Sequence, residues 1–117
     1  MAGATDPLFI NLTSDDGHRF AMALAFGGNQ AKLGHQLTIF INDRGVLVAS
    51  KANADKFPEQ QKTLASLLAA GASIYVCPMC MKHLGVKEDD LLPALKVGNP
   101  EAVGGALFKA GSKTLTW

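Results

Sequence analysis

Strand-like and helix-like segments alternate along the whole chain, and this alternation limits the possible folds more than any other feature. Apolar runs rich in β-branched or aromatic residues, which are typical of strands, lie at residues 8–12, 36–41, 72–76, 95–97 and 113–117. Helical segments are predicted between them, at about 18–33, 59–70 and 100–110. The alternation predicts right-handed βαβ units, and therefore an α/β fold with a mostly parallel sheet that has helices on both faces.

The length and composition indicate one domain spanning residues 1–117. Hydrophobic residues make up 48% of the chain and charged residues 18%, and the formal net charge of +1 comes without a basic cluster, so nucleic-acid binding is not predicted. No apolar run approaches the roughly 18 residues of a membrane span. The segment Met1–Asp6 lacks the basic and apolar regions of a signal peptide. We therefore expect a cytoplasmic protein without membrane contact.

The segment 18–33 carries more apolar surface than a helix on one face of a sheet requires. Phe20 and Leu24 belong to one helical stripe, whereas Met22, Phe26 and Leu33 form a second stripe on a different side. The second stripe predicts either a subunit interface or burial under another element of the same chain.

Ligands of parallel α/β folds bind beyond the carboxyl ends of the strands. Three segments meet this criterion, at residues 13–18, 42–45 and 77–83. We expect them to converge on one edge of the sheet. The polar segment 50–58 is predicted to be an exposed loop that could cover a site there.

Both cysteines of the chain lie in the third of these segments, three residues apart. Cys77 directly follows the strand at 72–76, where a thiol is held rigidly and partly exposed, and Cys80 falls one helical turn later. Backbone N–H groups at the start of the following turn, together with the nearby Lys82 and His83, favour a thiolate. In a reducing compartment such a pair indicates catalysis or metal binding more than a structural disulfide. Nucleophilic chemistry at Cys77 is the leading interpretation, and the alternative is that one or both thiols are small buried hydrophobic groups.

Two other chemistries share this spacing. A thioredoxin-like dithiol is disfavoured because the motif follows the third strand and Gly85 comes too soon for a long helix. A site for Zn(II) or Cu(I) would use Cys77, Cys80 and His83 with two methionines nearby, although a closed structural site needs a fourth ligand. Attachment of c-type haem is excluded because Met81 stands where C-x-x-C-H requires histidine.

Other polar residues near the predicted site are weaker candidates. His18 begins the first helix and could act as an acid or base, although a surface histidine near a helix cap is the simpler interpretation. Asp15 and Asp16 resemble a catalytic pair of carboxylates, but adjacent acidic residues at a helix start usually cap it.

The sequence resembles the DsrE/DsrF-like family, a group of small sulfur-relay proteins. The resemblance rests most specifically on Cys77-Pro78-Met79-Cys80 with Gly85 eight residues after the first cysteine. The opening strand with its loop at 13–16, the segment 91–98 and the terminal segment 113–117 extend the resemblance along nearly the whole chain.

The resemblance implies a three-layer α/β/α sandwich with a five-stranded, mainly parallel sheet. It implies that Cys77 carries sulfur as a persulfide between donor and acceptor proteins. Cys80 matches only the subgroup of the family that has a second cysteine, and it could resolve the intermediate as a disulfide or modulate it. Leu84 stands where the family has arginine, so any anion-stabilising role of that residue is lost or is supplied by Lys82 or Arg44. No cofactor is implied, and the trimers or hexamers of the family predict a homo-oligomer. A soft-metal-binding protein and a scaffold subunit with inactive cysteines are the alternatives.

Overall fold

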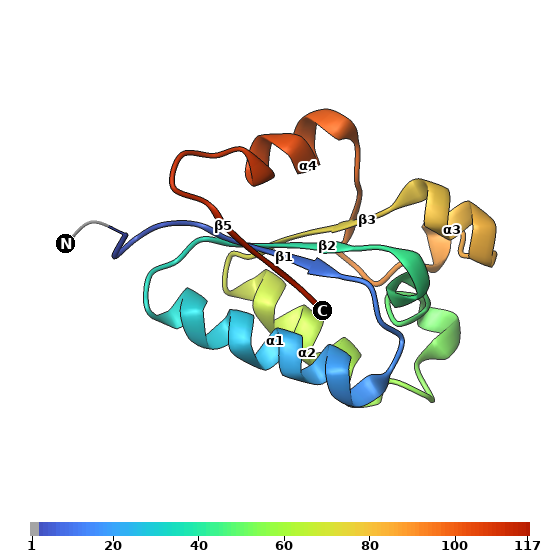
Figure 1. The fold of residues 1–117 in the computed structure, drawn as a ribbon. Helices are drawn as coiled ribbons and strands as arrows, with labels where there is room; N and C mark the ends of the chain where they lie inside the picture. Colours follow the sequence, from blue (N-terminus) through green and yellow to red (C-terminus); the bar gives the residue numbers. More distant parts are fainter. Residues whose placement is uncertain (1–2) are drawn as a thin grey trace.

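Five parallel strands form the centre of the structure, which is a computed structural model describing residues 3–117 (Figure 1). The strands are β1 (Leu8–Leu12), β2 (Leu37–Ile41), β3 (Ser73–Val76), β4 (Lys96–Val97) and β5 (Lys113–Thr116). They lie in the order β4-β3-β2-β1-β5, and each neighbouring pair is parallel, which confirms the predicted sheet. Met1 and Ala2, with which the segment assessed for a signal peptide begins, lie outside the described residues.

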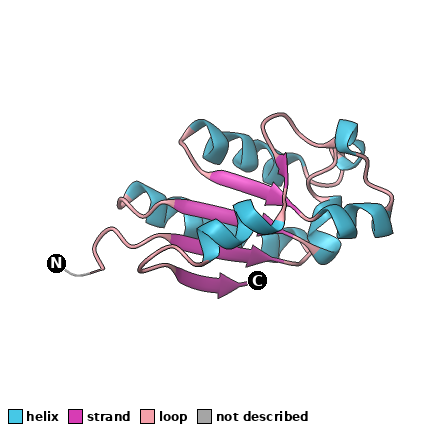
Figure 2. Cartoon of the chain, turned by 90° about the horizontal axis from the view of Figure 1, so that it is seen from above, coloured by secondary structure: helices cyan, strands magenta, loops and turns pink. Residues whose placement is uncertain are grey.

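Within residues 3–117, the first two helices agree with the predicted segments 18–33 and 59–70 to within one residue, the helix after Cys77 was expected only as a turn, and the last ends three residues before the predicted 100–110. Four α-helices connect the strands in all. They are α1 (Gly17–Lys32), α2 (Pro58–Ala69), α3 (Pro78–Leu84) and α4 (Pro100–Leu107). The helices α1 and α2 cover one face of the sheet, and α4 lies over the other (Figures 1 and 2). Between residues 3 and 117, no helix combines the length and the hydrophobicity that crossing a membrane requires.

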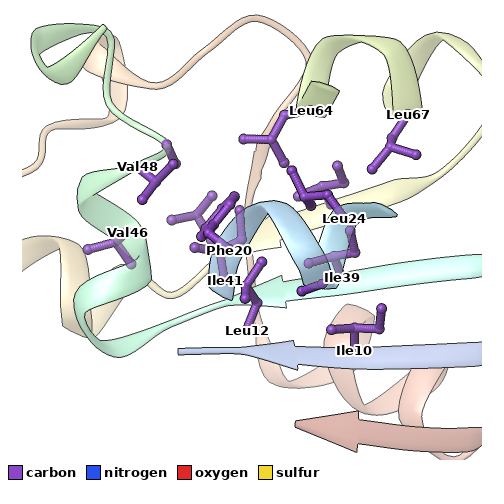
Figure 3. Packing of buried hydrophobic residues seen from close by; sticks show 14 of the residues in the cluster. Ile10, Leu12, Phe20, Leu24, Ile39, Ile41, Val46, Val48, Leu64 and Leu67 are labelled. Carbon is purple, nitrogen blue, oxygen red and sulfur yellow. The ribbon is translucent and has the colours of Figure 1, made fainter. Parts of the chain in front are cut away.

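The main core lies between the sheet and the pair α1 and α2. Alternate residues of each central strand point to this side, because successive side chains of a strand face opposite ways. Figure 3 shows how the side chains of α1 and α2 pack onto these strand residues. The largest fully buried side chains are Phe20, Ile10, Leu12, Leu24, Leu37, Ile39, Ile41, Leu64, Ile74, Val46, Val48 and Val76.

The second apolar stripe of α1 remains at the surface of the chain. Met22 is 45% exposed, Phe26 41% and Leu33 70%. Phe26 lies against Trp117, with the two ring centroids 5.9 Å apart. Burial under another element of the same chain is therefore wrong for Met22 and Leu33, whereas the predicted subunit interface stays a prediction.

The opposite face of the sheet is covered more thinly. Helix α4 has no buried residue, and all four residues of the edge strand β5 are exposed. The C-terminal end of β5 is held by the β1–α1 loop, because the carbonyl oxygen of Trp117 accepts the Thr13 N–H at 2.7 Å and its hydroxyl at 2.8 Å.

The prediction of an exposed loop over 50–58 is wrong at its start. Ser50 is only 3% exposed, and its backbone forms an antiparallel bridge with Leu91. The buried side chain of Gln61 donates a hydrogen bond to the Ser50 carbonyl at 2.8 Å. A short 3₁₀ helix, Lys51–Asn53, follows. Backbone pairing with distant residues, which local polarity does not reveal, therefore buries the beginning of this segment.

Candidate functional site

The carboxyl ends of β1, β2 and β3 bring the three predicted segments together. The side chain of Asn42, in the loop after β2, donates to that of Asn11 near the end of β1 at 2.5 Å, and the loop after β1 meets the loop after β2 next to this pair. Arg44 Nε donates to Asp15 Oδ2 at 2.9 Å and forms an ion pair between the same two loops. The remaining acidic residue, Asp16, caps α1 by accepting the N–H of Arg19, so the predicted capping role is confirmed.

Cys77 joins β3 to α3 and caps the helix. Its backbone is extended, Pro78 occupies the first turn, and its sulfur accepts the N–H of Cys80 with an N to Sγ distance of 3.4 Å. The helix ends after seven residues because Gly85 adopts a left-handed conformation with φ of 73°. Cys77 is half-buried at the carboxyl edge of the sheet and packs partly against the hydrophobic core.

Cys80 contacts the segment that follows the neighbouring strand β2. Its sulfur accepts the backbone N–H of Asp43 at 3.1 Å, across the contact between α3 and the 3₁₀ helix Asp43–Leu47 that follows β2. Asp43 has φ of 50°, a left-handed conformation that aspartate tolerates better than most residues. The segment 42–45 was predicted at the site, but the contact between Asp43 and Cys80 was not, since an aspartate two residues after the end of β2 is its only local signal.

Gly45 lets this 3₁₀ helix approach β1. Its N–H donates to the Thr13 carbonyl at 3.1 Å. A Cβ at this position would lie 2.9 Å from the carbonyl oxygen of Leu12, which belongs to the backbone and cannot move aside easily. The absent side chain therefore sets how closely the loops after β1 and β2 pack.

The surroundings of Cys80 favour its neutral form. Burial raises the pKa of the Cys80 thiol above its ordinary value of 9.0, and a hydrogen bond to the Cys77 side chain raises it further, against the opposing effect of the Asp43 N–H. Cys80 is therefore a thiol at neutral pH. In the unfolded chain Cys80 would have its ordinary pKa and would therefore ionise at a lower pH than in the folded protein. The free energy of unfolding is thus expected to fall as the pH rises above that ordinary pKa.

The other predicted site residues do not join the thiol pair. Lys82, His83 and His18 are exposed and, within residues 3–117, make no hydrogen bond or ion pair with either sulfur. Arg44 lies next to the site but is engaged by Asp15. Leu84, at the position of the family arginine, packs against the hydrophobic core. Over the described part of the chain, no three histidine, cysteine or acidic side chains form a group that could hold a metal ion.

Two hollows of the surface lie away from the sulfurs. One of about 550 Å³ runs between α1 and α2, and another of about 480 Å³ lies beside β5, where Phe26 and Leu115 line it. Neither Cys77 nor Cys80 lines these hollows. The thiol pair is thus placed at a sheet edge and not inside a small-molecule cavity of this kind.

Three solved structures share this fold. A protein of unknown function from Methanobacterium thermoautotrophicum, MTH1491, has a TM-score of 0.78 and 17% identity over 96% of this chain and 99% of its own. The ychN protein of E. coli has a TM-score of 0.72 and 16% identity over 97% and 99%. The protein BT1422 of unknown function from Bacteroides thetaiotaomicron has a TM-score of 0.74 and 21% identity over 100% and 99%. At these identities the likeness establishes the fold alone.

Sequence comparison extends the likeness to a family. The uncharacterized protein MJ0989 of Methanocaldococcus jannaschii is 34% identical over 76 residues, which make up 64% of this chain and 67% of that protein. The family model described as DsrE/DsrF-like matches residues 8–114, a range that contains both cysteines and the loops around them. This chain belongs to the DsrE/DsrF-like family.

Proposed function

We propose that this protein carries sulfane sulfur as a persulfide on Cys77 and passes it to a partner thiol. One observation carries the proposal: the half-buried Cys77 sulfur lies at the carboxyl end of β3, where the Cys80 N–H holds it. Membership in a family associated with sulfur relay supports it. The raised pKa of Cys80 supports the division of roles, because a thiol that stays protonated at neutral pH is a poor sulfur acceptor.

The transfer needs no cofactor. The Cys77 thiolate attacks the outer sulfur of a donor persulfide, a new sulfur–sulfur bond forms, the donor bond breaks, and the donor leaves as a thiolate. Attack of an acceptor thiolate on the outer sulfur reverses the roles and returns Cys77. The edge position of the thiols suits donor and acceptor proteins as partners, and a reducing compartment such as the cytoplasm would keep both thiols free.

The proposal is tested by loading the wild-type protein anaerobically with glutathione persulfide. We expect the intact mass to increase by one sulfur atom, and peptide mapping to place that atom on Cys77. Metal analysis of the same purified sample provides the competing outcome. Bound zinc or copper in a protein that takes up no sulfur would replace sulfur transfer with the soft-metal function.

We also propose that the protein forms a homo-oligomer through the outer surface of α1. Met22 and Phe26 expose apolar area on this helix, and Leu115 of the edge strand is 37% exposed and lines a hollow with Phe26. Contiguous exposed apolar side chains of this kind are typical of interaction surfaces. A trimer or hexamer remains the expectation from the family.

Replacing Phe26 with aspartate should lower the oligomeric state, because burying an unpaired carboxylate in an interface costs several kcal/mol. Light scattering at micromolar concentration measures the change. Ala65→Asp is the matched control, since it places the same charge at an exposed position of α2 and should leave the mass unchanged. A wild type that is already monomeric under these conditions would remove the basis for the interface.

A further inference from the structure

We propose that Cys80 is a resolving thiol that clears Cys77 persulfide when no acceptor takes the sulfur, releasing hydrosulfide and closing a Cys77–Cys80 disulfide. The inference rests on the proposed function, because it begins from sulfur loaded on Cys77. It adds a second outcome to that function: the same site either delivers its sulfur to a partner or discharges it as sulfide.

The geometry of the two cysteines supports this outcome. The Cys80 N–H already contacts the Cys77 sulfur, with an N to Sγ distance of 3.4 Å. Residues three apart across a tight turn have Cα atoms closer than about 7 Å, which overlaps the range of about 4.4–6.8 Å found in disulfides. The pair can therefore approach bonding distance by small movements within one turn.

The contact from Asp43 gives Cys80 a defined position and a means to carry negative charge. Its backbone N–H donates to the Cys80 sulfur at 3.1 Å from a strand-end loop that does not belong to α3. An N–H donor stabilises the thiolate that forms when Cys80 loses its proton. A small hydrophobic thiol would not need such a donor, so the contact favours a chemical role for Cys80.

The step balances without an added oxidant. Cys80 gives its proton to solvent, its sulfur attacks the inner sulfur on Cys77, and the bond between the inner and outer sulfur breaks. The outer sulfur leaves as hydrosulfide. The sulfane sulfur is reduced to sulfide while the two cysteine sulfurs are oxidised to a disulfide, and a dithiol reductant is needed to restore both thiols.

The neutral state of Cys80 makes this discharge slower than delivery. Burial, the hydrogen bond to Cys77 and the negative charges of Cys77 and Asp43 raise the pKa of Cys80. Only a small fraction of Cys80 is therefore ionised at neutral pH. A loaded protein would keep its sulfur long enough to meet an acceptor and would lose it only when none arrives.

The test compares wild type, Cys80→Ser and Met79→Ser after loading with glutathione persulfide and removal of the donor. Hydrosulfide is measured over time, and the protein is alkylated and weighed. We expect wild type to release one hydrosulfide per loaded chain and to acquire a Cys77–Cys80 disulfide that dithiothreitol reverses. Cys80→Ser should load equally and keep its sulfur at least about tenfold longer. A rise of one unit or more in the pKa of the attacking group lowers its ionised fraction at least about tenfold.

Met79→Ser controls for disturbance of α3, since Met79 is 78% exposed on the same helix, and it should behave as wild type. Equal loading followed by equally slow loss from wild type and Cys80→Ser would overturn the resolving role and leave the carrier function standing. A wild type that takes up no sulfur would overturn the carrier function, and this inference with it.

Discussion

Replacing Cys77 with serine should abolish sulfur loading from a persulfide donor. A serine oxygen cannot form the sulfur–sulfur bond in which the cargo is held, and the thiolate is the nucleophile in this chemistry. Loading is measured as the mass increase of the intact protein after anaerobic incubation with glutathione persulfide. Because Cys77 lies at the start of α3 and only half-buried, the substitution should leave the fold intact.

Cys80→Ala is the control for this result and separates sulfur transfer from metal binding. If Cys77 is the carrier, Cys80→Ala should load largely as wild type does. A metal site would need both thiolates, so either variant should then lose zinc or copper(I) affinity severely. Tight metal binding that fails equally in both variants, with no sulfur uptake by wild type, would contradict the assignment of Cys77.

Phe20→Ala should lower the free energy of unfolding by about 3–5 kcal/mol, the usual range for deleting a large aromatic side chain from a core. Phe20 is fully buried, and Figure 3 shows it beside Leu12 and Ile41 at the ends of two strands. The cavity would open next to the segment of Val46 and Val48, which follows Asp43. Urea denaturation followed by circular dichroism gives the change.

The same substitution at an exposed phenylalanine provides the comparison. Phe108 is 84% exposed, so Phe108→Ala should change stability by no more than about 0.5 kcal/mol. Comparable losses at the two positions would mean that Phe108 is buried in an assembly or that Phe20 is not a central core residue.

The main elements of the fold could be predicted because their signals are local. The segment predicted to be helical from about residue 100 begins there as α4, with Pro100 in the first turn and the Asn99 side chain accepting the Ala102 N–H at 2.8 Å. Gly85 marked the end of α3 for an equally local reason. The meeting of the site segments followed from the parallel order of the strands, which is a rule of topology and not of local sequence.

The detailed arrangement of the site could not be predicted in the same way. The bond from Asp43 to Cys80 joins residues 37 positions apart and depends on one left-handed backbone conformation. Similarly, the burial of Ser50 depends on its pairing with Leu91. Contacts of this kind are set by how elements pack, and neither hydrophobic periodicity nor residue type encodes them.

Because the edge strand β5 is attached to the loop after β1, this loop and the turn that holds Cys77 and Cys80 should differ in local stability. Strand β5 pairs with β1 on one side only, and its detachment would release Thr13 from the Trp117 carbonyl while exposing little additional apolar surface. Such openings occur at the low end of a protein's range of local unfolding energies. They would loosen the loop after β1, whereas the turn that holds Cys77 and Cys80 lies two strands further into the sheet. Partial fraying would therefore alter the rim that a partner meets and leave the sulfur chemistry in place.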